Sequence, residues 1–306
     1  MNIIEFGDCR TTMRRWAALG FRAQMCVTSP PYFGLRDYKH PGQIGLEPTV
    51  DEYVAGMVEV FRCVWDVLAD DGVLFLNLGD SYNGYMANQR GTGLEAGRQH
   101  SRKYIEPGAG LRTSTLKNKD LIGIPWRVAF ALQADGWYLR QDIIWHKPNP
   151  MPESVTDRCT KAHEYIFMLT KKERYYYDAV AIKEAAIHEG RVVKASGGDA
   201  KNAGKGTFGA TAAGFTQHDT LVTDRNKRDV WTVATRPYKG AHFATFPPAL
   251  IEPCVLATSR PGDIVLDPFM GSGTTAQVAL QHGRQYMGCE LNPEYEGLQR
   301  ERISSC

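Results

Sequence analysis

Short runs of consecutive apolar residues recur along the chain, each shorter than a helix of ordinary length. Such runs are typical of strands that are buried on both faces of a parallel sheet. Seven are predicted to be strands, at residues 2–6, 25–28, 72–78, 139–145, 164–170, 263–267 and 285–290. The aromatic triplet at 175–177 is predicted to end a further buried strand.

Helical spacing of apolar residues lies between these runs. Residues 49–68 follow a period close to 3.6, with apolar side chains at Tyr53, Met57, Val60, Phe61, Val64 and Leu68. Residues 124–133 and 274–282 follow the same period. Strands that alternate with helices predict an α/β fold, a mostly parallel sheet with helices on both faces.

Two segments depart from this alternation. Residues 83–120 are rich in Gly, Arg and Lys, and residues 195–215 form a low-complexity stretch rich in Gly and Ala. The whole chain of 306 residues is 43% hydrophobic and 23% charged, which is typical of a soluble globular protein. Its net charge of +2 neither requires nor excludes a nucleic-acid partner.

The seven cysteines are scattered, odd in number and without a C-x-x-C pair. This pattern argues against a disulfide framework and against a zinc site, so no metal is expected. The N-terminus lacks the apolar core of a signal peptide, and no run approaches the roughly 18 apolar residues of a membrane span. We therefore expect a cytoplasmic protein.

The first candidate chemical motif is Ser29-Pro30-Pro31-Tyr32, directly after a predicted strand. Two prolines fix the backbone and remove N–H donors, so the turn offers carbonyl oxygens. The carboxyl ends of parallel strands are where α/β folds build their active sites. The alternative is a plain structural turn, which would be favoured for Pro-Pro without its flanking Ser and Tyr.

The second motif is a glycine turn, also directly after a predicted strand. Glycines allow a tight turn and close approach of a ligand. A phosphate-binding P-loop would need a lysine that is absent, and the dinucleotide fingerprint is incomplete, so the turn suits a neutral or cationic nucleoside. The residues concerned are Asp267, Pro268, Phe269, Gly271, Ser272, Gly273 and Thr274.

The third motif is Glu290-Leu-Asn292, at the end of the next predicted strand. An acidic residue about 20 positions beyond a glycine turn is placed to bind the hydroxyl pair of a ribose. Glu290 and Asn292 are therefore candidate cofactor ligands.

Together these motifs resemble those of the amino-methylating DNA methyltransferases. In that family a (S/D/N)-PP-(Y/F) turn holds the target base, and an F-x-G-x-G turn holds S-adenosylmethionine. Here Ser29–Tyr32 and Phe269–Gly273 match, in the order of the permuted β class. The resemblance implies a Rossmann-like methyltransferase fold, with Asp8 at the adenine of the methyl donor and Phe246 and Pro247 near its methionine part.

The resemblance also predicts the organisation of the chain. Residues 1–178 would form the catalytic half, with 83–120 as an inserted basic loop. Residues 179–228 would be the target-recognition region, and residues 229–306 the cofactor-binding half of the same domain. Candidate DNA contacts are Lys147, Arg158, Arg225, Lys227 and Arg228.

The implied reaction is methylation of an exocyclic amine on a base flipped out of double-stranded DNA. In this reaction Ser29 and Pro30 would accept hydrogen bonds from the amine. Pro31 would shape the turn, and Tyr32 would stack on the base. The target amine can be cytosine N4 or adenine N6, and the two are nearly equally supported. Cytosine is slightly favoured, because Ser in the first position of this motif is more often associated with it in the family. Ring methylation at cytosine C5 is disfavoured, because Pro253-Cys254 lies within a predicted helix.

Two other kinds of function compete with this one. An RNA or protein-amide methyltransferase would usually carry Asn in place of Ser29 and the reverse motif order. A catalytically silent DNA-binding relative would not need intact Ser29, Gly271 and Glu290. A homodimer is expected from the resemblance, in a bacterial or phage-encoded protein, whereas a restriction-enzyme partner cannot be inferred.

Overall fold

The structure is a computed structural model, and it describes residues 1–38, 40–83, 116–186, 191–193, 220–235 and 246–304. The chain divides into two compact units, one of residues 1–178 with 229–306 and one of residues 179–228. Each unit is described by itself below. Within the described residues, no helix is long and apolar enough to cross a membrane.

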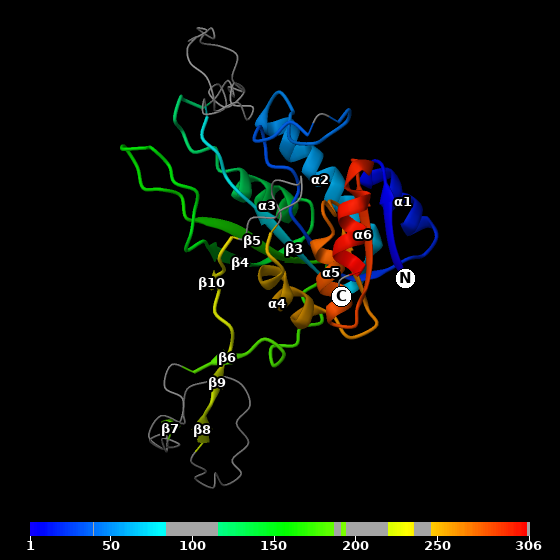
Figure 1. Cartoon of the computed structure of the whole chain (residues 1–306), viewed down its shortest axis with the longest axis vertical. Coiled ribbons are helices and arrows are strands. Elements are labelled where there is room, and N and C mark those ends of the chain that lie inside the picture. Colours follow the sequence, from blue (N-terminus) through cyan, green and yellow to red (C-terminus); the bar gives the residue numbers. More distant parts are fainter. Residues whose placement is uncertain (39, 84–115, 187–190, 194–219, 236–245, 305–306) are drawn as a thin grey trace, which may run out of the picture. The chain divides into compact units, whose positions relative to one another are not determined.

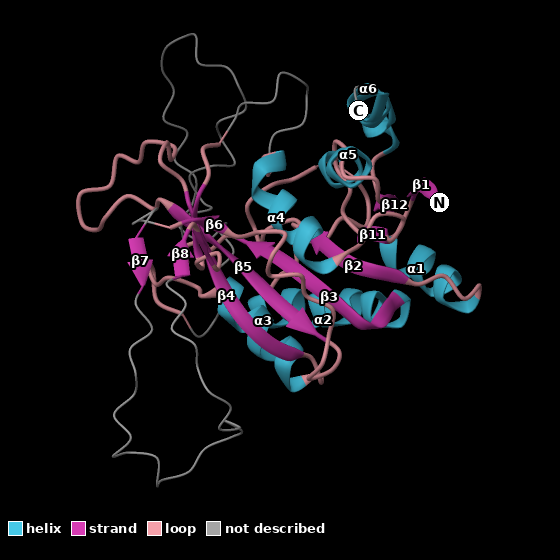
Figure 2. Cartoon of the chain, turned by 90° about the horizontal axis from the view of Figure 1, so that it is seen from below, coloured by secondary structure: helices cyan, strands magenta, loops and turns pink. Residues whose placement is uncertain are grey.

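The first unit is built on an eight-stranded sheet (Figures 1 and 2). Seven strands point the same way, and β5 alone runs antiparallel to both of its neighbours. In spatial order the strands are β1 (Asn2–Phe6), β12 (Gln285–Glu290), β11 (Ile264–Asp267), β2 (Ala23–Thr28), β3 (Leu68–Leu78), β5 (His163–Thr170), β4 (Tyr138–His146) and β10 (Val230–Thr232).

Helices cover both faces of this sheet (Figure 2). On one face lie α1 (Cys9–Ala18), α2 (Val50–Val67) and α3 (Ile124–Ala134). On the other lie α4 (Pro248–Thr258) and α5 (Thr274–Gln281), and α6 (Glu296–Ser304) packs against α5. A 3-10 turn, η3 (Pro293–Tyr295), precedes α6. The predicted α/β fold with helices on both faces is confirmed.

The sequence pattern explains the two cores on either side of the sheet. Successive residues of a strand point to opposite faces, so Met25 and Val27 of β2 enter one core and Cys26 enters the other. Helix α2 begins with a capping box, in which Thr49 and Glu52 satisfy each other's backbone N–H groups. The seven predicted strands and three predicted helices all form, with ends within a few residues of those expected.

The aromatic triplet at 175–177 is a correction. Strand β5 ends at Thr170, and Tyr175 and Tyr177 lie in irregular chain beyond it. The Lys171 ammonium donates to the carbonyls of Trp65 and Leu68 there, at 3.0 and 2.9 Å. This polar turn ends the strand before the aromatic residues are reached.

The second unit contains two short antiparallel ladders among its described residues. One pairs β6 (Glu184–Ala185) with β9 (Asp224–Arg225), and the other pairs β7 (Arg191–Val193) with β8 (Thr220–Val222). The two ends of the unit therefore run side by side. Glu184 accepts from the Nε atoms of both Arg225 and Arg228, at 3.0 and 2.6 Å.

Candidate active site

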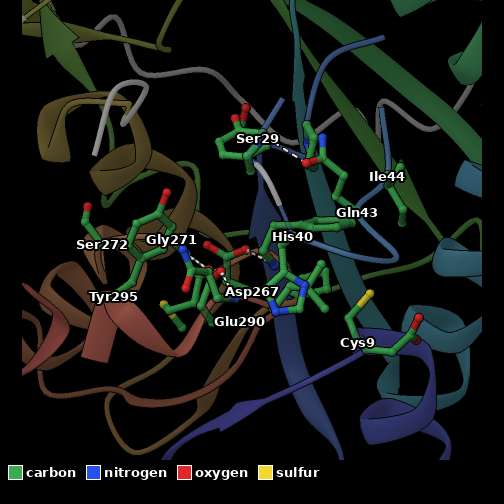
Figure 3. A pocket seen from close by; sticks show the side chains of 18 of the residues that line it. Cys9, Ser29, His40, Gln43, Ile44, Asp267, Gly271, Ser272, Glu290 and Tyr295 are labelled. Atoms are coloured by element: carbon green, nitrogen blue, oxygen red, sulfur yellow. Dashed lines mark hydrogen bonds between the residues drawn. The ribbon is translucent and has the colours of Figure 1, made fainter. Parts of the chain in front are cut away.

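A cavity lies where the carboxyl ends of four neighbouring parallel strands meet (Figure 3). Its space, with the open mouth included, is about 960 Å³. The segments after β1, β2, β11 and β12 all contribute to its wall, because parallel strands bring their carboxyl ends to one edge. Its lining includes the predicted site residues Asp8, Ser29, Pro31, Phe246, Asp267, Pro268, Phe269, Gly271, Ser272, Thr274, Glu290 and Asn292.

Four predicted site residues do not line this cavity: Pro30, Tyr32, Pro247 and Gly273. Pro30 and Pro247 are buried, and Pro247 is the N-cap of α4. Gly273 is the N-cap of α5, and its φ of +86° is a left-handed conformation that favours glycine. It therefore shapes the turn that presents its neighbours.

Glu290 organises the side of the cavity that is formed by the glycine turn and the end of β12. Its Oε2 accepts from the backbone N–H of Gly271 at 2.8 Å, and its Oε1 accepts from the backbone N–H of Asn292 at 2.8 Å. The side chain is 8% exposed, and burial raises the pKa of this carboxyl. Each carboxylate oxygen has a second lone pair, so the group can still accept from a ligand's hydroxyls at the cavity wall.

The glycine turn carries a buried side-chain oxygen that has no hydrogen-bond partner among the described residues. This oxygen is the Oγ of Ser272, which is 1% exposed and lines the cavity. Buried polar atoms are rarely left unpaired, so this hydroxyl is suited to a ligand. Gln299 of α6 supports the turn from behind, donating from Nε2 to the carbonyl of Gly271 at 2.7 Å.

Asp8 lines the cavity and also begins α1. Its Oδ1 accepts from the backbone N–H of Arg10 at 2.8 Å and of Thr11 at 3.2 Å. The Arg10 guanidinium pairs with the other oxygen at 2.6 Å and lowers the pKa of this carboxyl. The acid therefore stays ionised, and both of its oxygens act as hydrogen-bond acceptors.

Asp267 joins the glycine turn to the Ser29–Tyr32 turn. Its carboxylate accepts from the Thr28 hydroxyl at 2.6 Å, the Thr275 hydroxyl at 2.6 Å and the Phe269 N–H at 2.9 Å. Thr28 directly precedes Ser29, so one buried group fixes both turns. Burial outweighs these hydrogen bonds and raises the pKa of Asp267 to about 6.

This raised pKa predicts how an Asp267→Asn variant behaves. Folding favours the protonated form of this acid. Its contribution to the free energy of unfolding is therefore fully present below the ordinary aspartate pKa of 3.8, and it is lost as pH rises through about 6. Between pH 5 and pH 8 the free energy of unfolding of the wild type should fall by roughly 1–2 kcal/mol relative to that of Asp267→Asn, which cannot ionise. Denaturant unfolding of both proteins at the two pH values measures the difference, and a constant difference would contradict the raised pKa of this buried acid.

The Ser29–Tyr32 turn is held by hydrogen bonds to neighbouring elements. Ser29 is half-buried at the cavity wall, and the Tyr53 hydroxyl donates to the Pro31 carbonyl at 2.9 Å. Tyr32 does not line the cavity, and its hydroxyl lies 2.8 Å from Glu164 Oε2. Glu164 pairs through its other oxygen with Lys147, which also lies 4.2 Å from the Trp145 ring centroid.

The segment after the catalytic turn forms a wall that the sequence analysis missed. Gln43 braces it, accepting from the Tyr38 N–H at 2.7 Å and donating to the Arg36 carbonyl at 3.0 Å. The available signal was position, because this Gly- and Pro-containing stretch directly follows the catalytic motif. The additional lining residues here are Tyr38, His40, Gly42, Gln43 and Ile44, and Tyr295 lines the opposite side (Figure 3).

None of the candidate DNA-contacting cations is among the residues that line this cavity. Arg158 pairs with Glu153 at 2.6 Å and lies over the Tyr82 ring. Arg225, Lys227 and Arg228 belong to the second unit. Most of the predicted basic loop, residues 84–115, lies outside the described residues.

A DNA methylase family model matches residues 23–300, which is most of the chain. The chain belongs to the DNA methylase family. This DNA methylase is 47% identical to the type II methyltransferase M.Cfr9I of Citrobacter freundii over 300 residues, which cover 97% of this chain and 86% of that protein. It is also 47% identical to M.SmaI of Serratia marcescens over 280 residues, covering 90% and 82%.

Solved structures share the fold of the DNA methylase. The cytosine-N4-specific PvuII DNA methyltransferase matches with a TM-score of 0.63 and 18% identity, over 99% of this chain and 86% of that one. M1.HpyAVI in complex with S-adenosylmethionine matches with a TM-score of 0.55 and 17% identity, over 99% of both chains.

The predicted family, enzyme class and cofactor are thereby confirmed. The chain is an S-adenosylmethionine-dependent DNA methyltransferase, which decides against the RNA, protein-amide and silent alternatives. The cavity fits this donor, because it offers an acid at the end of β12, a glycine turn and the unpaired Ser272 hydroxyl. The donor supplies a methyl group on a sulfonium that can leave as a neutral thioether.

Proposed function

We propose that the enzyme methylates the N4 amine of cytosine in a specific double-stranded DNA site. One observation carries the proposal: Ser29 lines the same cavity as Glu290 and Gly271, so a base amine held by Ser29 faces the donor side. A hydroxyl accepts from either amine, but Ser at this position favours cytosine within the family resemblance. The fold relative that is cytosine-N4-specific supports the same choice.

The proposed role of the catalytic turn is to localise the lone pair of the amine. An exocyclic amine is a poor nucleophile because its lone pair is delocalised into the ring. The Ser29 hydroxyl and the Pro30 carbonyl each accept a hydrogen bond from one N–H group of the amine. This arrangement favours a pyramidal nitrogen whose lone pair points toward the methyl group. The Tyr32 ring stacks on the flipped base, and holding amine and methyl in line contributes as an effective concentration.

The proposed donor site divides the ligand between the strand ends. Glu290 and Asn292 accept the ribose hydroxyls, and Asp8 accepts the adenine amine. Residues 267–274 wrap the remainder, with Ser272 supplying a hydrogen bond and Phe246 an apolar contact. Pro247 supports Phe246, and Gly273 shapes the turn.

Residues 179–228 are proposed to recognise the target sequence, and residues 83–120 to contact DNA phosphates. In the second unit, Arg225 and Arg228 share the Glu184 carboxylate and Lys183 pairs with Asp224, a charged group suited to DNA. Lys147 and Arg158 are further proposed phosphate contacts. Because its bacterial relatives modify DNA, we place the enzyme in the bacterial cytoplasm, as a homodimer by family resemblance.

Nucleoside mass spectrometry tests the proposal directly. Plasmid DNA is incubated with the protein and isotopically labelled S-adenosylmethionine, then digested to nucleosides. We expect labelled N4-methylcytosine. Labelled N6-methyladenine would keep the amine chemistry and overturn the choice of cytosine, and labelled C5-methylcytosine would overturn the role of Ser29.

A further inference from the structure

A chain of hydrogen-bonding side chains leads away from the proposed base site. The Ser29 hydroxyl lies 3.3 Å from Tyr32 Oη, and Tyr32 Oη lies 2.8 Å from Glu164 Oε2. Lys147 pairs with the second oxygen of Glu164. These residues come from three strand ends, since Ser29 follows β2, Glu164 begins β5 and Lys147 follows β4.

Partners from the sheet hold the carboxylate of Glu164 in place. The Asn77 amide nitrogen donates to Glu164 Oε2 at 3.2 Å and to the Tyr165 carbonyl at 3.1 Å. Asn77 is 4% exposed, in the otherwise apolar strand β3. A polar side chain there is costly unless it is paired. Its two donated hydrogen bonds fix the start of β5, and its Oδ1 lies 3.3 Å from Tyr32 Oη.

The direction of each hydrogen bond follows from the groups involved. A carboxylate only accepts, and Glu164 Oε2 at 2.8 Å is a closer acceptor than Asn77 Oδ1 at 3.3 Å, so the Tyr32 O–H donates to Glu164 and the phenol oxygen accepts from Ser29. Burial and the neighbouring carboxylate hold the pKa of the Tyr32 phenol well above its usual value, so it keeps its proton. The Ser29 proton therefore points away from the base, and its lone pairs face the target amine.

We propose that Glu164 is the terminal proton acceptor of methyl transfer, reached from the target amine through the hydroxyls of Ser29 and Tyr32. The proposal rests on the proposed amine chemistry and deepens it. It assigns functions to Glu164 and to the Tyr32 hydroxyl that base stacking does not require.

The bonds and protons balance along this chain. The amine nitrogen forms a bond to the methyl carbon, and the carbon–sulfur bond breaks with its electron pair going to sulfur. One N–H proton passes to Ser29 Oγ while the Ser29 proton passes to Tyr32 Oη and the Tyr32 proton to Glu164 Oε2. The products are a methylated neutral amine, a thioether and a protonated Glu164, whose 15% exposure lets it return the proton to water.

The Tyr32 ring itself is fixed independently of its hydroxyl. A Cβ added at Gly79 would lie 2.5 Å from Tyr32 Cε2, so the glycine leaves room for the ring to pack against the backbone. A phenylalanine at position 32 can therefore keep the ring position and lose only the proton-carrying oxygen. This makes Tyr32→Phe a specific test of the chain.

The experiment measures single-turnover methylation of plasmid DNA by Tyr32→Phe, Glu164→Gln and the double variant, at saturating donor. A glutamine at 164 can still accept a hydrogen bond through its amide oxygen but cannot hold the proton. The single-turnover rate of each single variant should be lower than that of the wild type by about 10²-fold. The double variant should lose little more, because one broken link already interrupts the chain, and donor and DNA affinities should change little.

Tyr53→Phe is the matched control, because it removes another buried phenol oxygen that contacts the same turn, at Pro31. Its effect on the rate should multiply with that of Glu164→Gln, since it lies outside the chain. Wild-type rates in Tyr32→Phe or Glu164→Gln, or effects of the two that multiply, would overturn the relay. A wild type that methylates no amine would instead refute the proposed function.

Discussion

Replacing Ser29 by alanine should lower the single-turnover rate of methyl transfer by about 10²–10³-fold, the usual cost of removing one preorganised polar contact to a reacting group. The physical reason is local, because alanine cannot accept from the amine and cannot begin the route to Tyr32. The Ser29 hydroxyl meets Tyr32 Oη at 3.3 Å, a long contact whose loss costs the fold little. The variant should therefore stay folded.

Ser272→Ala is the matched comparison, because it removes a hydroxyl from the opposite side of the same cavity. It should weaken donor binding and change the rate at saturating donor little. Ser29→Ala should do the reverse. Calorimetric donor affinity and quenched-flow methylation distinguish the two, and an unchanged rate in Ser29→Ala would refute the proposed amine contact.

The convergence of the main site residues could be predicted because it follows from the parallel direction of the strands that they end. Residues directly after apolar runs meet at one edge when those strands are parallel, so Ser29, Asp267 and Glu290 were expected to converge, and they line one cavity. The glycine turn added a local signal. No long-range geometry was needed beyond the direction of the strands.

Glu164 and Asn77 could not be found in the same way. The apolar run of β5 looks like those of the other strands, and nothing in it says that β5 runs antiparallel. Reversal brings the beginning of β5, instead of its end, to the catalytic edge. Asn77 lies within an apolar run, where a single polar residue has many structural explanations.

Helix α1 was missed for a different reason. Its buried residues Cys9, Thr12, Met13 and Trp16 keep helical spacing, but arginine and threonine fill much of the segment. The signal that was available is the N-cap, because Asp8 accepts from two backbone N–H groups of the first turn. Asp8 therefore both begins the helix and lines the cavity.

Replacing Glu290 should weaken donor binding more than any other single change on the donor side. Hydrogen bonds to charged groups contribute roughly 1.5–3 kcal/mol each, so Glu290→Ala should raise the donor Kd by about 10²-fold. The loss has two sources. The ribose hydroxyls lose their acceptor, and the N–H groups of Gly271 and Asn292 lose the group that aligns both segments.

Glu290→Gln separates these two sources. The single amide oxygen can serve only one of the two backbone N–H groups, and its NH2 group is a donor where the ribose requires an acceptor. We expect a Kd between those of the wild type and Glu290→Ala. Exposed Glu294, four positions on, supplies the control, and Glu294→Gln should bind the donor as the wild type does. If Glu290→Ala bound the donor with wild-type affinity, the acid would be a loop brace only, and the ribose would have to be held elsewhere in the cavity.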